Sequence, residues 1–238
     1  MINTTIDSII FPNIKICQPD KKSGFRFGSD SIVLSYFSRI KPNSFVADVG
    51  SGSGIIATLI ASFYNANVVA IEIQEEIFYC LKETINLSNL KDKITPINCD
   101  ILEYKKDKPF DIVISNPPYR KIGTGKISKN ETESRARFSH NMDLEALLKF
   151  SKSNLKYGGK LCFSYDADMS VDAISICRNY NFEPKRLRFV YPDIDKQAKL
   201  ILVECVFGGG KEINIEPPLF QNGLYSEEYA NIFKGVWT

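Results

Sequence analysis

Short runs of apolar residues alternate with helical patterns from about residue 45 onward. Alternating strand and helix signals of this kind predict a parallel sheet covered by helices on both faces. The expected strands are residues 45–49, 68–73, 94–98, 110–115 and 160–165. The expected helices are residues 54–63, 74–88, 143–155 and 170–180. The pattern therefore predicts an α/β fold.

Two further strand patterns, residues 186–191 and 200–207, are joined by a polar segment at residues 192–199. A connection between parallel strands needs a dozen or more residues. Because this segment is shorter, we expect these two strands to pair antiparallel. The sequence thus predicts a seven-stranded mixed sheet with an antiparallel last strand.

Residues 9–17 and 25–27 flank a turn-rich stretch at residues 19–24, which predicts a small hairpin before the sheet. A helix capped near Ser29 or Asp30 is expected next. Its apolar face would consist of Ile32, Val33, Tyr36, Phe37 and Ile40. We interpret the 238 residues as a single domain. It would comprise an N-terminal lid at 1–44, a core at 45–207 and a C-terminal extension at 208–238.

Composition narrows the class of protein. Six cysteines form no C-x-x-C pair, and the N-terminus lacks the basic-then-apolar pattern of a secretory signal. We therefore expect reduced thiols and a cytoplasmic location. The longest apolar stretches, at residues 55–63 and 112–114, fall short of the roughly 20 residues that span a bilayer. We expect a monomer with no membrane contact and no metal ion.

The formal net charge of +2 is too small to indicate nucleic-acid binding by itself. Positive charge is concentrated locally, at residues 120–140 and 185–199. The candidate phosphate contacts are Arg120, Lys121, Arg135, Arg137, Lys185 and Arg186. A solvated surface explains either cluster equally well when it is considered alone.

Residues 48–54 read Asp-Val-Gly-Ser-Gly-Ser-Gly, between the first sheet strand and a helix. Gly50, Gly52 and Gly54 allow a tight turn and a close approach of the backbone to a ligand. The dinucleotide pattern G-x-G-x-x-G would require glycine where Ile55 stands. This difference favours S-adenosylmethionine, whose carboxylate suits a helix N-terminus and whose cationic groups suit Asp48. The alternative is a turn that only lets strand and helix pack.

Two acidic residues follow the next two strands. Glu72 lies about twenty residues after the glycine turn, where an acid can accept hydrogen bonds from ribose hydroxyls. A charge within the apolar run 70–73 is costly to bury unless it is paired or reaches the sheet edge. Asp100 is a candidate acceptor for the adenine amino group of the cofactor. Asp also commonly ends a strand as a turn residue, so both roles stay open for Asp100.

Asn116, Pro117, Pro118 and Tyr119 directly follow the apolar strand at residues 110–115. A side-chain amide held by prolines is a fixed acceptor, and the following ring offers a flat face. A planar amine is a poor nucleophile because its lone pair is delocalised. Hydrogen bonds from its two protons to the Asn116 side-chain oxygen and to a backbone carbonyl favour localising that lone pair. The pattern predicts methyl transfer to an amino group, with Asn116, Pro117 and Tyr119 as catalytic residues.

With these motifs in this order, residues 45–207 resemble the class I, Rossmann-like S-adenosylmethionine-dependent methyltransferases that act on amino groups. Residues 24–30, 208–211, 217–219 and 224–229 resemble those of the bacterial tRNA1(Val) adenine-N6 methyltransferases, which modify the adenine next to the anticodon. The resemblance implies that Arg26 and Asn116 belong to the cofactor site. Residues 136–140 depart from that family, reading Ala-Arg-Phe-Ser-His where it has Ala-Arg-His-Glu, so no family role is carried over to His140. For this single histidine we expect a surface or capping role.

The resemblance implies that an adenine of a tRNA leaves its stack, with Asn116 and the Pro117 carbonyl holding N6 and Tyr119 packing on the ring. A release-factor glutamine methyltransferase uses the same four residues but normally has a longer helical N-terminal domain. A DNA adenine methyltransferase would normally add a target-recognition domain. A cofactor-binding module and a dinucleotide oxidoreductase are further alternatives, against which Ile55 and Asn116 argue.

Overall fold

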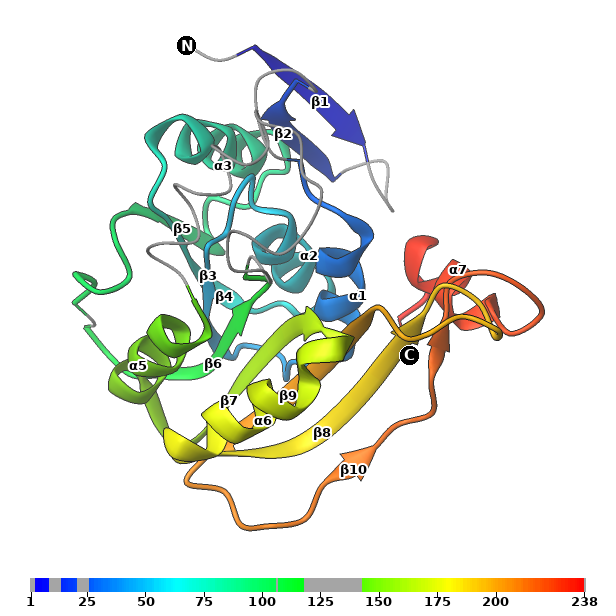
Figure 1. Cartoon of the computed structure of the whole chain (residues 1–238). Coiled ribbons are helices and arrows are strands. Elements are labelled where there is room, and N and C mark those ends of the chain that lie inside the picture. Colours follow the sequence, from blue (N-terminus) through cyan, green and yellow to red (C-terminus); the bar gives the residue numbers. More distant parts are fainter. Residues whose placement is uncertain (1–2, 9–13, 21–25, 106, 118–142, 238) are drawn as a thin grey trace, which may run out of the picture.

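The computed structural model describes residues 3–8, 14–20, 26–105, 107–117 and 143–237. Figure 1 shows a central sheet with helices packed against it. The longer strands are β3 Phe45–Val49, β4 Asn67–Glu72, β5 Ile94–Asn98, β6 Phe110–Ser115, β7 Leu155–Asp166, β8 Phe182–Tyr191 and β9 Leu200–Phe207. Two short strands, β10 Asn214–Ile215 and β11 Leu219–Phe220, both pair with β8. The order across the sheet is β10-β8-β9-β7-β6-β3-β4-β5.

All the predicted sheet strands are present. Strand β3 runs parallel to both β4 and β6, whereas β9 runs antiparallel to both β7 and β8. The prediction of a mixed sheet with an antiparallel last strand is therefore confirmed. Among the described residues the sheet has nine strands instead of seven, because β10 and β11 both pair with β8. Strands as short as these show no apolar alternation that a sequence pattern could reveal.

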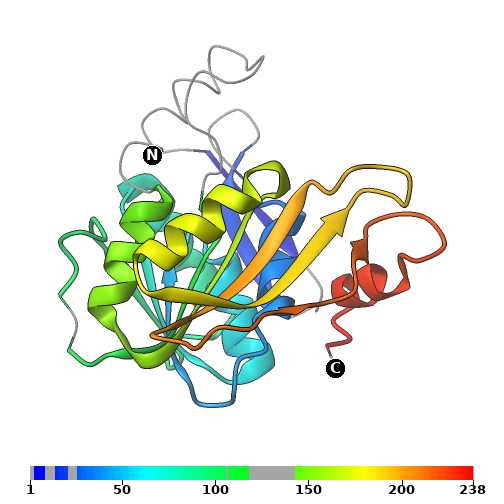
Figure 2. The same ribbon diagram turned by 60° about the horizontal axis from the view of Figure 1, so that its bottom comes forward.

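The helices are α1 Ser29–Phe37, α2 Ile55–Tyr64, α3 Glu75–Leu87, α5 Leu144–Asn154, α6 Ser170–Asn179 and α7 Glu227–Phe233, with a 3-10 turn η1 at Ala167–Met169. Helices α1, α2 and α3 share one apolar core with the sheet, and α5 and α6 share a second core on the other face. Figure 2 shows α5 and α6 together on one side of the sheet. Helix α7 in the C-terminal extension was not predicted.

Strand β6 shows how the sheet separates the two cores. Ile112 and Ile114 pack with α1, α2 and α3, whereas Val113 packs with α5 and α6. Since β3, β4, β5 and β6 are parallel, their carboxyl ends meet at one edge of the sheet. Ligands of open α/β sheets bind outside such an edge. The candidate residues that follow these four strands are therefore brought to the same edge.

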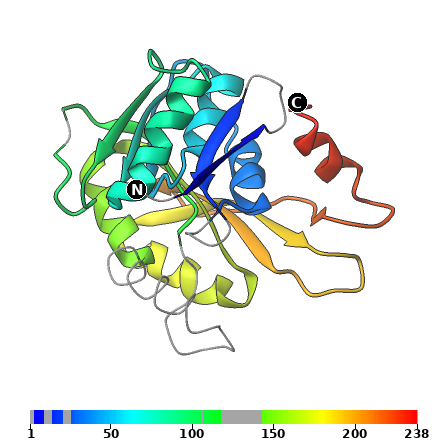
Figure 3. The same ribbon diagram turned by 90° about the horizontal axis from the view of Figure 1, so that it is seen from above.

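The N-terminal hairpin differs from the prediction. Strand β1, Thr4–Ser8, pairs antiparallel with β2, Lys15–Pro19, while residues 26–28 form no strand. The prediction of a small hairpin before the sheet is therefore confirmed, but residues 4–8, and not 25–27, supply the second strand. Figure 3 shows the hairpin beside α3, where Cys17 N donates to Thr84 Oγ1 over 3.0 Å. Strand β1 was missed because it is mostly exposed and is held by backbone pairing, which leaves no apolar alternation in its sequence.

Helix α1 forms where it was predicted, although Gly28 and not Ser29 or Asp30 occupies the N-cap position. The predicted apolar residues Ile32, Val33, Tyr36, Phe37 and Ile40 are all buried. Helix α1 is buried on every residue from 31 to 37, because α2, the sheet and the C-terminal extension surround it. The N-terminal segment at residues 1–44 thus contributes a helix to the apolar interior of the domain.

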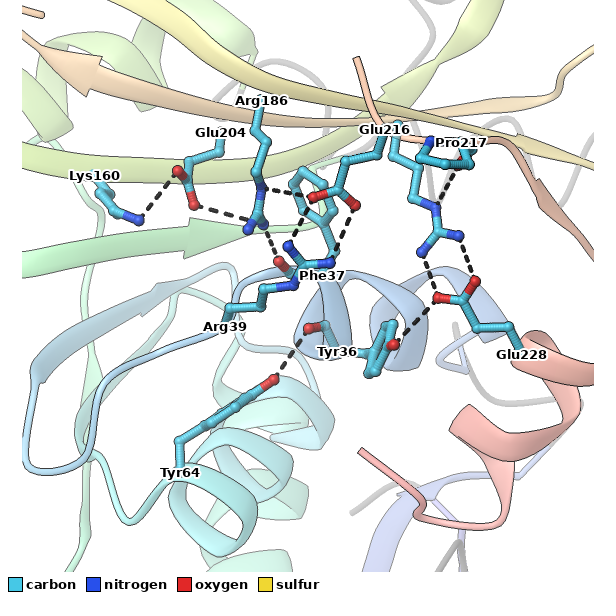
Figure 4. A network of polar contacts seen from close by, with 11 residues as sticks. Tyr36, Phe37, Arg39, Tyr64, Lys160, Arg186, Glu204, Glu216, Pro217 and Glu228 are labelled. Carbon is cyan, nitrogen blue, oxygen red and sulfur yellow. Dashed lines mark hydrogen bonds and ion pairs between the residues drawn. The ribbon is translucent and has the colours of Figure 1, made fainter. Parts of the chain in front are cut away.

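The C-terminal extension is fastened to α1 and β8 through Glu228. Arg188, only 5% exposed, donates to the two Glu228 carboxylate oxygens over 2.6 Å each and to the Pro217 carbonyl over 2.9 Å. The Tyr36 hydroxyl donates to the same carboxylate over 3.1 Å (Figure 4). Trp237 stacks on Phe63 of α2 at a centroid distance of 3.7 Å. These contacts close the extension over one end of α1.

We expect Glu228→Ala to lower the free energy of unfolding by about 1 to 3 kcal/mol, because the buried Arg188 guanidinium loses its carboxylate partner and keeps only the hydrogen bond to the Pro217 carbonyl among those described. The hydrogen bonds from Arg188 lower the pKa of Glu228. Their stabilisation is therefore present above the usual glutamate range and is lost as the pH falls through the lowered value. Urea unfolding at pH 7 measures the effect. Glu227→Ala on the same helix turn is the matched control, with an expected change within about 0.5 kcal/mol; equal effects of the two variants would contradict the prediction.

Candidate cofactor and amine-binding site

The glycine turn adopts the left-handed backbone that its sequence predicts. Gly50, Gly52 and Gly54 have φ angles of 70°, 55° and 87°. A Cβ on Gly54 would come within 2.6 Å of a Leu81 side-chain atom, so this glycine lets α2 pack closely on α3. A Cβ on Gly52 would meet no described atom within 4 Å. The turn therefore packs tightly against α3 at Gly54, whereas Gly52 has space beside it for a ligand.

Asp48 lies fully buried beneath this turn. Its Oδ2 accepts a hydrogen bond of 3.0 Å from the Ala57 amide in the first turn of α2, and its Oδ1 has no hydrogen-bond partner among the described residues. Burial raises the pKa of Asp48 to about 7, and the nearby Glu72 charge adds to the rise. The predicted role of Asp48 as an anion near a cationic ligand stays a prediction.

The raised pKa of Asp48 predicts a pH-dependent stability. Because the folded value lies above the unfolded value, the stabilisation is fully present below about pH 4 and is lost as the pH rises through about 7. We expect Asp48→Asn to reduce the loss of unfolding free energy between pH 5 and pH 8 by an amount on the order of a few kcal/mol. Urea unfolding of both proteins across this range measures it. Parallel stability curves would show that Asp48 does not titrate there.

Glu72 ends β4 with its side chain turned to the glycine turn. Its Oε2 accepts from the Gly52 amide over 2.9 Å, and its Oε1 accepts from the Gln74 amide over 2.9 Å. Glu72 is 4% exposed, and burial raises the pKa of its carboxyl group against the lowering effect of these hydrogen bonds. The structure thus brings Glu72 and Gly52 together, and the predicted contact of Glu72 with ribose hydroxyls stays a prediction.

Asp100 and Arg26 have local partners. Asp100 follows β5, and its Oδ1 accepts a hydrogen bond of 2.9 Å from the Leu102 amide, which is the turn role left open by the sequence. Arg26 pairs with Asp7 and donates to Thr5 Oγ1 over 2.7 Å, so its guanidinium fastens the N-terminal hairpin. Cofactor contacts by either residue stay predictions.

Asn116 directly follows β6, and its carboxamide contacts two other elements. Its Nδ2 donates to Ser31 Oγ of α1 over 2.9 Å, and Ser164 Oγ of β7 donates to its Oδ1 over 2.5 Å. Pro117 is buried beside it. Sequence analysis missed Ser31 and Ser164, although a serine at position 164 inside the apolar strand 161–165 was a usable signal. The other predicted residues of this region lie outside the described residues: Pro118, Tyr119, Arg120, Lys121, Arg135, Arg137 and His140.

Arg186, one of the two candidate phosphate contacts on β8, has acidic partners inside the fold. Through β9 and β7, Arg186 is in register with Ile114, one residue before the carboxyl end of β6. Its side chain is 12% exposed and lies 3.6 Å from Glu204 and 3.3 Å from Glu216, with the guanidinium 4.2 Å from the centre of the Phe37 ring (Figure 4). These partners do not support a phosphate contact by Arg186, because its charge is already paired and mostly buried.

Lys185 is the neighbour of Arg186 on β8. Its ammonium group donates to the carbonyls of Gly210 and Lys211 over 3.1 Å and 3.0 Å. The side chain therefore contacts the C-terminal extension where that extension leaves the sheet. A phosphate contact by Lys185 stays a prediction.

Comparison with known proteins agrees with this arrangement. The methyltransferase small domain family model matches residues 27–175, more than half of the chain. A tRNA1(Val) (adenine(37)-N6)-methyltransferase of Bacteroides thetaiotaomicron is 27% identical over 217 residues, covering 89% of this chain and 90% of the relative. A Parabacteroides distasonis relative of the same name is 27% identical over 223 residues, with coverage of 91% and 92%.

A solved structure, that of a predicted O-methyltransferase from Agrobacterium tumefaciens, superposes with a TM-score of 0.68 at 17% sequence identity. The match covers 87% of this chain and 96% of that one. The sheet, its helices and the glycine turn thus define a Rossmann-like methyltransferase fold. The chain belongs to the methyltransferase small domain family.

The residues at the carboxyl edge fit S-adenosylmethionine. A cationic ligand with ribose hydroxyls needs acceptors, and Asp48 has a buried Oδ1 with no hydrogen-bond partner among the described residues. Glu72 offers a buried carboxylate at the end of β4, and the turn is open at Gly52. In the part of the chain that the structure describes, no cluster of three metal-ligating side chains is found, and no helix is long and apolar enough to cross a bilayer.

Proposed function

We propose that this protein transfers the methyl group of S-adenosylmethionine to N6 of an adenine in a tRNA, next to the anticodon of a valine tRNA. The observation that supports this most directly is the Asn116 carboxamide, held at the carboxyl end of β6 by Ser31 and Ser164. Two relatives that cover most of the chain have names that specify this reaction. A single domain of residues 1–238, acting as a cytoplasmic monomer, is part of the proposal.

In this reaction the main task of the protein is to position the cofactor methyl group and the adenine amine. S-adenosylmethionine, when bound, supplies an electrophilic methyl carbon attached to a sulfonium. Glu72 would accept hydrogen bonds from the ribose hydroxyls, and the open turn at Gly52 would lie against the ligand. Asn116 Oδ1 and the Pro117 carbonyl would accept the two protons of the adenine amine, which favours localising the nitrogen lone pair. No strong base is needed, because the amine proton can leave after the nitrogen has attacked.

Binding of the flipped base needs additional contacts. Stacking of an extruded base on an aromatic ring contributes roughly 1 to 3 kcal/mol, comparable to the few kcal/mol that unstacking costs. Tyr119 is the proposed ring. Phosphate contacts must therefore supply most of the affinity for the RNA, and we assign these to Arg120, Lys121, Arg135, Arg137 and Lys185.

The proposal is tested by incubating the purified protein with labelled cofactor and separate pools of tRNA, rRNA, DNA and release factor. We expect label only in tRNA, and nuclease digestion with mass spectrometry should locate N6-methyladenine next to the anticodon of a valine tRNA. Label in the release factor would instead identify a protein-glutamine methyltransferase, the nearest alternative. Absence of label in every pool, with cofactor bound, would favour a binding module.

We expect RNA affinity to fall with salt, and neutralising Arg135 and Arg137 together to make the slope of log affinity against log salt shallower by about 1 to 2. The reason is that binding releases fewer counterions from the RNA when fewer phosphates are contacted. Fluorescence anisotropy with labelled tRNA between low and moderate salt measures the slope. Replacing Lys91 and Lys93, which lie between α3 and β5, is the control with an expected unchanged slope. An unchanged slope in the arginine variant would remove both residues from the interface.

A further inference from the structure

The Asn116 carboxamide is held from both sides by hydroxyl groups. Ser31 lies on α1, in the segment before the core, and Ser164 lies on β7. The two residues are 5% and 0% exposed, and their hydroxyl groups contact Nδ2 and Oδ1 of Asn116 over 2.9 Å and 2.5 Å. A third serine, Ser115, donates to the Val49 carbonyl over 2.8 Å and so joins the end of β6 to the end of β3.

We propose that Ser31 and Ser164 form a hydroxyl clamp that sets the plane of the Asn116 carboxamide for the incoming amine. They are positioning residues, since they act through Asn116. The inference rests on the proposed function, because it deepens the account of how the same site binds an amino group. It also assigns α1 a part in the site, since one half of the clamp lies outside residues 45–207.

The clamp restricts the terminal torsion of the Asn116 side chain. The terminal torsion of an asparagine side chain has a broad, roughly two-fold profile, so an unheld carboxamide can rotate or flip. An amide oxygen has two lone pairs. Because Nδ2 donates to Ser31 and Oδ1 accepts from Ser164, the two serines hold the plane of the amide, and that plane determines the directions from which its oxygen can accept an amine proton. Near-attack geometry depends on such directions, because a displacement of 1 Å can cost roughly 100-fold in rate.

Burial strengthens the argument. Ser31 and Ser164 are nearly or fully buried, so a polar partner for each hydroxyl is expected on energetic grounds. Helix α1 is itself held by packing in the core and by the Tyr36 hydroxyl bond to Glu228. Strand β7 is held by its register with β6 and β9. The clamp is therefore built on two rigid elements, which is what accurate positioning of a site requires.

The test compares Ser31→Ala and Ser164→Ala with Ser38→Ala and Ser151→Ala. In the described part of the chain, the hydroxyls of these two buried control serines donate to backbone carbonyls of their own helix segments, at Ser35 and Leu147. We expect each clamp variant to lower kcat on tRNA by about 10- to 100-fold, with the cofactor dissociation constant changed less than about 2-fold. Ser31→Thr, which keeps the hydroxyl, should recover most of kcat. The two control variants should keep kcat within about 2-fold of the unmodified protein.

A second readout needs no substrate. The side-chain NH2 signals of Asn116 can be assigned by NMR from their loss in Asn116→Ala, and their hydrogen exchange should accelerate about 10-fold in Ser31→Ala, because a hydrogen bond to that group is removed. If the unmodified protein methylates no tRNA while this acceleration is seen, the proposed function fails and the clamp stands. If tRNA is methylated but both clamp variants keep their kcat, the clamp is overturned. A fall in kcat with unchanged exchange would also overturn it.

Discussion

Asn116→Ala is expected to lower the rate of methyl transfer by about 1,000-fold or more while leaving the affinity for S-adenosylmethionine nearly unchanged. The variant removes the acceptor that binds the amine proton as the nitrogen attacks, and the structure places Asn116 at the end of β6, not in the glycine turn. Single-turnover assays with labelled cofactor measure the rate, and calorimetry measures cofactor affinity. Equal turnover by the variant and the unmodified protein would exclude Asn116 from the mechanism.

Asn116→Asp distinguishes the contribution of the side-chain oxygen of Asn116 from that of its NH2 group. It keeps an acceptor for the Ser164 hydroxyl and for the amine, but it loses the amide N–H that donates to Ser31. We therefore expect an activity between those of the alanine variant and the unmodified protein. Asn154→Ala is the control, because Asn154 is a buried asparagine on α5 whose amide donates only to its own helix, at the Phe150 carbonyl over 2.8 Å.

Glu72→Ala is expected to weaken cofactor binding by about 100-fold, because a charge-assisted hydrogen bond contributes about 1.5 to 3 kcal/mol. Two contributions are lost together: the proposed bonds to the ribose hydroxyls and the bond that holds the Gly52 amide in the turn. Calorimetric titration of S-adenosylmethionine measures the change. At saturating cofactor, the rate of transfer should fall much less than the affinity, since Glu72 is distant from the amine in the proposed mechanism.

Glu72→Gln is the conservative partner of that experiment. The amide keeps one acceptor oxygen and loses the charge, so we expect an affinity between those of the alanine variant and the unmodified protein. Glu76→Ala is the matched control, because Glu76 is an exposed acid in the first turn of α3, close in sequence to Glu72. An unchanged cofactor affinity in Glu72→Ala would remove the residue from the cofactor site.

The comparison of Arg186 with Asp48 shows where sequence patterns stop being informative. A run of basic residues suggested a phosphate-binding surface, yet Arg186 faces Glu204 on the neighbouring strand and Glu216 in the C-terminal extension. Those partners are distant in sequence and meet only through strand register. Asp48 lies next to a glycine pattern that suggested ligand contact, whereas its Oδ2 accepts a hydrogen bond from the Ala57 amide in the first turn of α2. Charge can be counted along a chain, but its partner depends on three-dimensional pairing.

The N-terminal segment illustrates the same limit. The apolar face of α1 was predictable, since Ile32, Val33, Tyr36, Phe37 and Ile40 repeat at helical spacing and are all buried. The strand that pairs with β2 was not predictable, because β1 is exposed and is held mainly by backbone hydrogen bonds to β2. The contact of Ser31 with Asn116 spans 85 residues of sequence, so no local pattern could indicate it.

The sequence by itself determined the alternation of strands and helices, the glycine turn, and the order of Glu72, Asp100 and Asn116 along the chain. Hydrophobic periodicity and backbone freedom are local properties, so they can be deduced from neighbouring residues. The tertiary structure alone decided which strand pairs with β2 and that Arg186 forms an ion pair with Glu204 inside the fold. It also decided that serines of α1 and β7 form hydrogen bonds with the Asn116 amide. These depend on packing between distant segments, whose geometry exists only once the chain has folded.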